Sequence, residues 1–191
     1  LRGFVGEALQ RLVCPSLERE ARRELTERAE QHAIEVFARN LRNLLLQPPV
    51  SGRKIVALDP GFRSGCKLAA LDEFGNVLCH DVIHVVRKAE RQAPARTRLA
   101  ELVREHGISV VAIGNGTACR ETETFVAQML AAELADDDVA YVIVNEAGAS
   151  VYSTSELGRE ELPDYDATQR SAVSIGRRLL DPLSELVKIN P

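Results

Sequence analysis

The chain has 191 residues, of which 45% are hydrophobic and 4% aromatic, and a formal net charge of −4 at pH 7. The length allows one ordinary domain with an appendage, and the aliphatic composition supports a true core. The negative charge excludes a generally basic surface, so nucleic acid could bind only through a local basic patch.

Neither a secretory signal nor a membrane span is expected, because no apolar stretch approaches the roughly 18 residues that a span requires. The four cysteines lack C-x-x-C spacing, which favours reduced thiols and a cytoplasmic setting; they are Cys14, Cys66, Cys79 and Cys119. The chain begins at Leu1, its single methionine is Met129, and no polar tail follows Ile189. We therefore expect a piece of a longer protein.

A long helix is predicted over residues 16–46, starting from Ser16 as the N-terminal cap and ending before Pro48 and Pro49. Apolar residues recur along it with helical spacing. The other face alternates Arg with Glu, which favours a neutralised, solvated surface over a nucleic-acid-binding one. We assign residues 1–50 to this helical segment and residues 51–191 to a second domain. The apolar stripe needs a partner, from the second domain or from outside the fragment.

A three-stranded meander is predicted next. Residues 54–65 read KIVALDPGFRSG, in which a short β-branched run ends at Asp59 and is stopped by Pro60-Gly61. Two more apolar runs follow, over 66–72 and 77–86, each after a tight turn. Asp59 thus closes the first strand. As an alternative, Asp59 is simply a turn residue bonded to its own backbone.

The second half of the domain alternates helices and strands. A helix over 99–105 is capped near Gly107, a strand ends in the Gly114-Asn115-Gly116 turn, and a helix opens at Thr117. Another strand ends at Glu146, and a final helix follows. This alternation predicts right-handed crossovers and parallel pairing. The fold class is therefore α/β: an RNase H-like mixed sheet, meander first and then β-α-β units.

Asp59, the glycine-bracketed turn and Glu146 all come at strand ends, where parallel sheets place ligands. Two converging carboxylates would repel unless a cation lay between them, and Mg²⁺ or Mn²⁺ prefers such oxygen ligands. The turn suits an anion, although an ordinary β-to-α connection explains it equally well. Arg63, Lys67 and Arg120 could bind phosphates as point charges. His80 and His84 are about 13 Å apart along a strand, too far for a shared metal.

Several stretches resemble the YqgF/RNase H-like domain of the Tex family of bacterial transcription accessory proteins. They are LDPGFRSGCKLAALDEFGNVL, AIGNGTACRETE, VNEAGASVYSTSELGREELPD and RSAVSIGRRLLDPLSELVKINP. Residues 15–49 resemble the helical segment that precedes this domain. The resemblance implies a cytoplasmic protein working with nucleic acid and transcription, in a family whose members carry further RNA-binding modules.

YqgF-type nucleases use three acidic positions, and the resemblance assigns two of them to Asp59 and Glu146. The third belongs at the start of the last helix, where Asp166 comes too early and alignment places Thr168. This implies an incomplete metal site and a non-catalytic scaffold. It would bind nucleic acid, RNA rather than DNA, mainly through modules outside this fragment. The candidate contacts within the chain are Arg63, Lys67, Asn115, Arg120 and Arg170.

Three alternatives stay open. A Mg²⁺- or Mn²⁺-dependent nuclease would use Asp59, Glu146 and Asp166. An ATPase is suggested by the likeness of DPGFRSG to the phosphate loop of actin-like kinases, although that fold needs two such domains. On the last helix, Arg170, Arg177 and Arg178 would either face phosphates or form structural pairs.

Overall fold

The structure is a computed structural model that describes residues 2–62, 65–85 and 92–189. The chain divides into two compact units, residues 1–46 and residues 47–191. Each unit has its own secondary structure.

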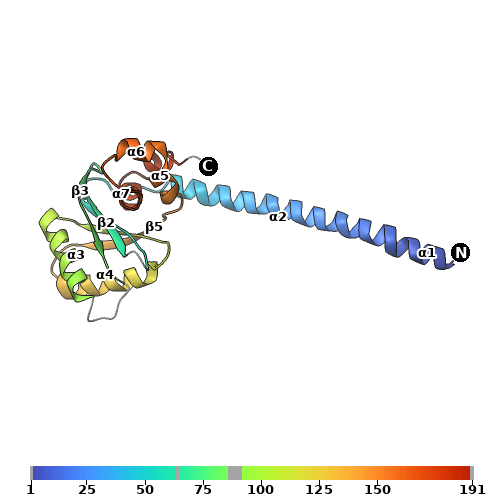
Figure 1. Ribbon diagram of the computed structural model, residues 1–191, viewed down its shortest axis with the longest axis horizontal. Coiled ribbons are helices and arrows are strands. Elements are labelled where there is room, and N and C mark those ends of the chain that lie inside the picture. The colour runs from blue at the N-terminus through green and yellow to red at the C-terminus, as the bar shows by residue number, and fades with distance from the viewer. Residues whose placement is uncertain (1, 63–64, 86–91, 190–191) are drawn as a thin grey trace. The chain divides into compact units, whose positions relative to one another are not determined.

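The first unit is helical (Figure 1). It consists of α1 (Arg2–Ala8), a π-helical turn η1 (Leu9–Val13) and α2 (Cys14–Leu45). The prediction that a helix begins at Ser16 was wrong, because the preceding residues are already helical and supply its hydrogen-bond partners. Pro15 lies in the first turn of α2, where a missing N–H is tolerated.

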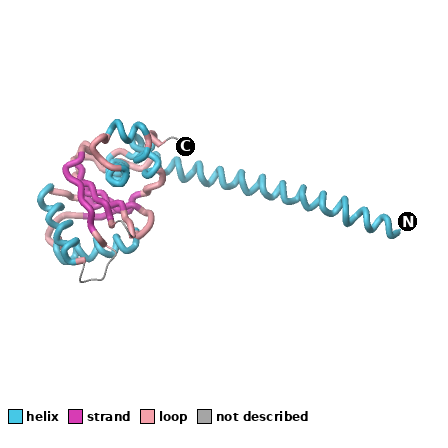
Figure 2. Tube along the Cα trace, viewed as in Figure 1, coloured by secondary structure: helices cyan, strands magenta, loops and turns pink. Residues whose placement is uncertain are grey.

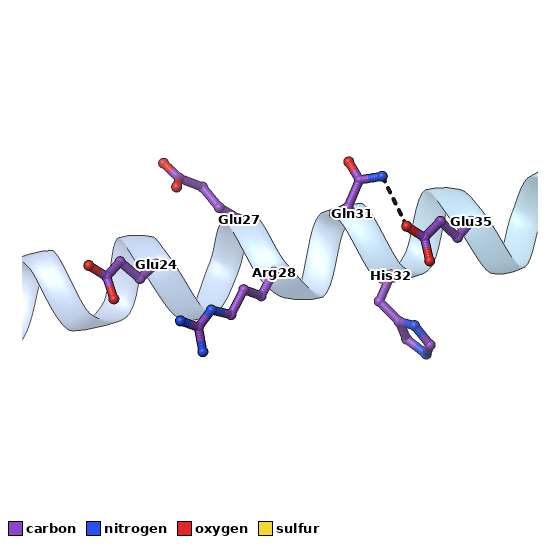
Figure 3. Close-up of a pocket in the computed structure, with 6 residues that line it drawn as sticks. All are labelled: Glu24, Glu27, Arg28, Gln31, His32 and Glu35. Carbon is purple, nitrogen blue, oxygen red and sulfur yellow. Dashed lines mark hydrogen bonds between the residues drawn. The ribbon is translucent and has the colours of Figure 1, made fainter.

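The surface of α2 is solvated, and none of the described side chains between residues 4 and 46 is buried. Arg23 and Glu27 form an ion pair at helical spacing, 3.8 Å apart. Figure 3 shows a shallow hollow lined by Glu24, Glu27, Arg28, Gln31, His32 and Glu35. All six come from this one helix, with Gln31 donating to Glu35 at 3.2 Å. A single helix provides only one wall, so we assign no ligand to this hollow.

The second unit contains a five-stranded mixed sheet in the order β3-β2-β1-β4-β5. The strands are β1 (Ile55–Asp59), β2 (Cys66–Leu71), β3 (Val77–Ile83), β4 (Val110–Gly114) and β5 (Ala140–Val144). β1 pairs antiparallel with β2 and β2 with β3, whereas β1–β4 and β4–β5 are parallel. The predicted meander, the parallel crossovers and the RNase H-like fold class are confirmed.

Helices cover both faces of this sheet (Figures 1 and 2). On one face lie α3 (Ala93–His106) and α4 (Cys119–Glu133), and on the other α5 (Ala149–Thr154), α6 (Glu156–Glu161), α7 (Ala167–Leu180) and α8 (Pro182–Leu186). Successive side chains of β1 point to opposite faces of the sheet, and therefore pack against different helices. Val56 and Leu58 join the core under α3 and α4, while Ile55 and Ala57 pack with residues of α7. Asp59 continues the second set.

Of two predicted helix ends, one is confirmed by the structure and the other is wrong. Gly107 adopts a left-handed conformation, with φ of 64°, and caps α3 as predicted. The helix predicted to open at Thr117 instead begins at Cys119, after Ala118, which has a positive φ of 64°. The turn between β4 and α4 is therefore longer than the sequence indicated.

Candidate functional site

Asp59 lies half-buried at the end of β1, on the face that α7 covers. Its Cα partner across the antiparallel pair is Lys67 of β2. The hydroxyl of Ser171, on α7, hydrogen-bonds to the Asp59 carboxylate. Burial raises the pKa of Asp59, and the Ser171 bond and the positive charge of Lys67 offset part of this rise. The carboxylate thus sits between two strands and a helix.

Glu146 follows β5 and is tied to the turn after β4 by two reciprocal hydrogen bonds. The N–H of Asn115 donates to the carbonyl of Val144 at 2.9 Å, and the N–H of Glu146 donates to Oδ1 of Asn115 at 3.1 Å. Asn115 was predicted to contact nucleic acid. In the structure its side-chain oxygen holds the backbone of Glu146.

The carboxylate of Glu146 occupies the glycine turn itself. A Cβ atom added to Gly114 or Gly116 would collide with its oxygens, so only glycine leaves room for it. The N–H of Gly116 donates to the carboxylate. This turn was predicted to suit an anion, and the anion that it holds is a side chain of the same domain.

Electrostatics link the two acids. Burial raises the pKa of Glu146, the charge of Asp59 raises it further, and the Gly116 N–H and the charge of Arg178 lower it. The fold therefore brings Asp59 and Glu146, 87 positions apart in the sequence, to one edge of the sheet, where the charge of Asp59 acts on Glu146. Repulsion between them needs compensation from neighbouring groups.

Asp166 plays a different part, because it caps α7. Its Oδ1 accepts hydrogen bonds from the N–H groups of Thr168 and Gln169, at 2.8 and 2.9 Å, and from the Thr168 hydroxyl at 2.7 Å. The Gln169 side chain completes a capping box by accepting from the Asp166 N–H at 2.9 Å. The α7 residue that reaches Asp59 is Ser171, whereas the family resemblance assigned the third acidic position to Thr168.

We expect Asp166→Ala to destabilise the domain by about 1 kcal/mol at pH 7, because two N–H groups of α7 lose their acceptor. The Gln169 N–H, followed by the Thr168 hydroxyl, lowers the pKa of Asp166. The carboxylate's contribution is thus complete above its unfolded pKa of about 3.9 and disappears as the pH falls through the lower folded value. Urea unfolding at pH 7 and pH 3 measures this. Asp166→Asn, which can also cap, should stay near wild type, and equal losses in both variants would contradict the prediction.

The arrangement does not fit a two-metal centre. Within the described ranges no group of three or more His, Cys, Asp or Glu residues could hold a metal ion. Glu146 is turned into the glycine loop, Asp166 caps a helix, and the α7 side chain at Asp59 is the neutral Ser171. Asp59 and Glu146 are the two carboxylates that lie at this edge of the sheet.

The predicted basic contacts have diverse surroundings. Arg170 donates from Nε to the carbonyl of Leu162 at 3.1 Å and from Nη1 to that of Ser153 at 2.9 Å, which favours a structural role. Arg120 is exposed in the first turn of α4. Lys67 is half-buried beside Asp59. Arg63 lies outside the described residues.

Arg178 belongs to this site, although the sequence suggested only a choice between phosphates and ion pairs. Its side chain is buried, with 4% exposure. Nη1 donates to the carbonyls of Asn145 and Ala147, each at 2.8 Å, and so binds the backbone on both sides of Glu146. It lies two turns beyond Ser171, and this i, i+7 spacing was the available signal.

Comparison with known proteins places these features in context. Residues 53–180 match the family described as the Tex protein YqgF-like domain. The chain is 50% identical over its whole length to the Bacillus subtilis protein named "Uncharacterized protein YdcI", of which it covers 26%. It is 46% identical to "Transcriptional accessory protein Tex" of Neisseria gonorrhoeae, with 92% of this chain and 23% of that protein covered.

A human protein named "S1 RNA-binding domain-containing protein 1" is 45% identical over the full chain, which covers 19% of it. The chain thus spans about a quarter or less of the length of these relatives. Among solved structures, Thermus thermophilus RuvC matches with a TM-score of 0.49 and 14% identity, over 71% of this chain and 97% of that one. That likeness is too remote to bear on function. In the described residues, no helix is both long and apolar enough to cross a membrane.

Proposed function

Because this chain belongs to the Tex protein YqgF-like domain family, we propose that residues 47–191 are a non-catalytic, nucleic-acid-associated scaffold within a Tex-like protein. The names of its relatives, a transcriptional accessory protein and an S1 RNA-binding domain-containing protein, support RNA and transcription as its setting. The chain covers only about a quarter of such proteins, so most of the RNA contact is assigned to their other parts. The four free cysteines agree with a cytoplasmic location.

One observation carries the non-catalytic assignment: the α7 group that meets Asp59 is the hydroxyl of Ser171. A neutral hydroxyl adds no charge to hold a divalent cation, whereas metal-dependent phosphodiester cleavage relies on clustered carboxylates. The Gly116 N–H and Arg178 offset only part of the rise that burial and Asp59 cause in the pKa of Glu146, and Oε2 of Glu146 has no hydrogen-bond partner among the described residues.

The surroundings of the arginines on α7 support a weak contact between this domain and nucleic acid. Arg170 bonds to backbone carbonyls, Arg177 bonds to the carbonyl of Gly75 and to Glu161, and Arg178 is buried. These cations hold the domain together. Because these three arginines are bonded or buried within the domain and the chain has a net charge of −4, we expect few phosphate contacts from this part of α7.

We expect the isolated chain to bind single-stranded RNA and duplex DNA weakly, with log K falling by about one unit or less per tenfold increase in salt. A full-length relative should show a slope several times steeper and a preference for RNA. Fluorescence anisotropy between about 50 and 200 mM salt measures both quantities. A steep slope for the isolated chain would place the principal contacts in this domain and contradict the proposal.

The second candidate is a Mg²⁺- or Mn²⁺-dependent nuclease, and one observation favours it: Asp59 and Glu146 meet at one sheet edge despite their repulsion. The same samples, incubated with Mn²⁺ and branched DNA, single strands or RNA, separate the two functions. The scaffold predicts no cleavage. Cleavage that disappears in Asp59→Asn would establish the nuclease.

A further inference from the structure

Lys67 faces the acidic edge from the neighbouring strand. It pairs directly with Asp59 in the antiparallel register, and side chains opposite each other in such a pair point to the same face, with Cβ atoms about 4.5–5.5 Å apart. Ala69 and Leu71, the alternate residues of β2, pack with Ala172 and Val173 of α7. Lys67 therefore extends into the layer between the sheet and the start of α7. Its Nζ donates to the carbonyl of Gly65 at 3.4 Å, a long bond to the main chain before β2.

The charge of Lys67 acts on two carboxylates at once. It offsets part of the rise that burial causes in the pKa of Asp59, and it adds to the hydrogen bonds that lower the pKa of Asp166. On the other side of the edge, Arg178 offsets part of the rise that burial and Asp59 cause in the pKa of Glu146. Each acid of the edge thus has a cation supplied by the protein, and the cation that faces Asp59 is carried on β2.

We propose that the Lys67 ammonium is the resident cation of this site, which balances Asp59 and keeps divalent metal ions out. The inference deepens the proposed scaffold function, on which it rests, by explaining why two convergent acids need no metal. A divalent ion beside Asp59 would lie within several ångströms of a fixed positive charge in a half-buried setting. At a separation of about 6 Å and an effective dielectric constant of about 20, such repulsion weakens binding on the order of ten-thousandfold, and even at the dielectric constant of water, about 80, it weakens binding about tenfold.

Removing the charge should therefore create a metal site. We expect Lys67→Met to bind Mn²⁺ at least about tenfold more tightly than the wild-type chain, since the repulsion is lost and both carboxylates stay. Titration of the six-line electron paramagnetic resonance signal of free Mn²⁺ measures this directly. Lys67→Arg is the matched control, because it keeps the positive charge and should bind like wild type.

Specificity is checked by combining Lys67→Met with Asp59→Asn, which should abolish the gain. The proposal would be overturned if Lys67→Met bound Mn²⁺ no more tightly than the wild-type chain does. Circular dichroism melting establishes that each variant is folded, and Lys67→Gln replaces Lys67→Met should the latter unfold.

The two proposals fail separately. Cleavage of nucleic acid by the wild-type chain, or a steep salt slope, would overturn the scaffold function whatever the Mn²⁺ titration shows. Unchanged Mn²⁺ affinity on removal of the lysine charge would overturn the resident-cation proposal, even where the wild-type chain neither cleaves nor binds RNA tightly.

Discussion

Arg178→Met is expected to destabilise residues 47–191 by about 3–5 kcal/mol, the cost typical of removing one partner from a buried charged network. Methionine preserves most of the apolar volume but loses the two bonds from Nη1 to the carbonyls of Asn145 and Ala147. It also removes the positive charge that Glu146 and the buried Glu185 face. Urea unfolding followed by circular dichroism measures the loss.

Arg177 provides a matched control one position earlier on α7. Its side chain is 22% exposed, and it bonds to the carbonyl of Gly75 and to Glu161. Arg177→Met should therefore cost about 1 kcal/mol, because water can replace part of what is lost. Arg178→Lys keeps the charge but cannot span both carbonyls, and should fall between the two. A smaller loss for Arg178→Met than for Arg177→Met would refute the positioning role.

Gly176→Val should destabilise the same unit by about 2–3 kcal/mol, through overpacking where α7 approaches the sheet most closely. A Cβ atom at this position would lie 2.5 Å from Cδ1 of Leu71 and 3.0 Å from Cβ of Ala57. Since a strand atom such as the Ala57 Cβ cannot move aside, the helix must shift away from β1 and β2. Thermal and urea unfolding report the cost.

Gly6→Val is the control for this prediction, because Gly6 also lies in a helix and a Cβ there would meet nothing within 4 Å. Valine is no worse than glycine in a helix interior, so this control should stay within about 0.5 kcal/mol of wild type. The shift of α7 should also weaken the Ser171 bond to Asp59. Equal stability of Gly176→Val and wild type would show that α7 can retreat without cost.

Both predictions concern α7 because this helix organises the acidic edge. Ser171, Ile175 and Arg178 follow each other at helical spacing on its inner face. The first meets Asp59, the second is fully buried in the core beside Ile55 and Ala57, and the third grips the loop that carries Glu146. Any movement of α7 therefore changes the surroundings of both acids together.

The sequence alone determined the local features of this domain. Short β-branched runs broken by Pro and Gly indicated the meander, and Asp59 and Glu146 were recognised at strand ends because turn chemistry and periodicity are encoded within a few residues. The cap at Gly107 was likewise confirmed. Two predicted helix starts were wrong: α4 begins at Cys119 and not at Thr117. Ser16 is no cap, since a cap residue has no such role when the chain before it is already helical.

Only the tertiary structure decided what surrounds the acids. The rotation of α7 against the sheet selects Ser171 to meet Asp59, with Asp166 at the helix cap, and the pairing register sets Lys67 opposite Asp59. The glycine turn holds Glu146 because two parallel strands end side by side. These relations join residues far apart in the chain through packing and register, which no window of neighbouring residues specifies.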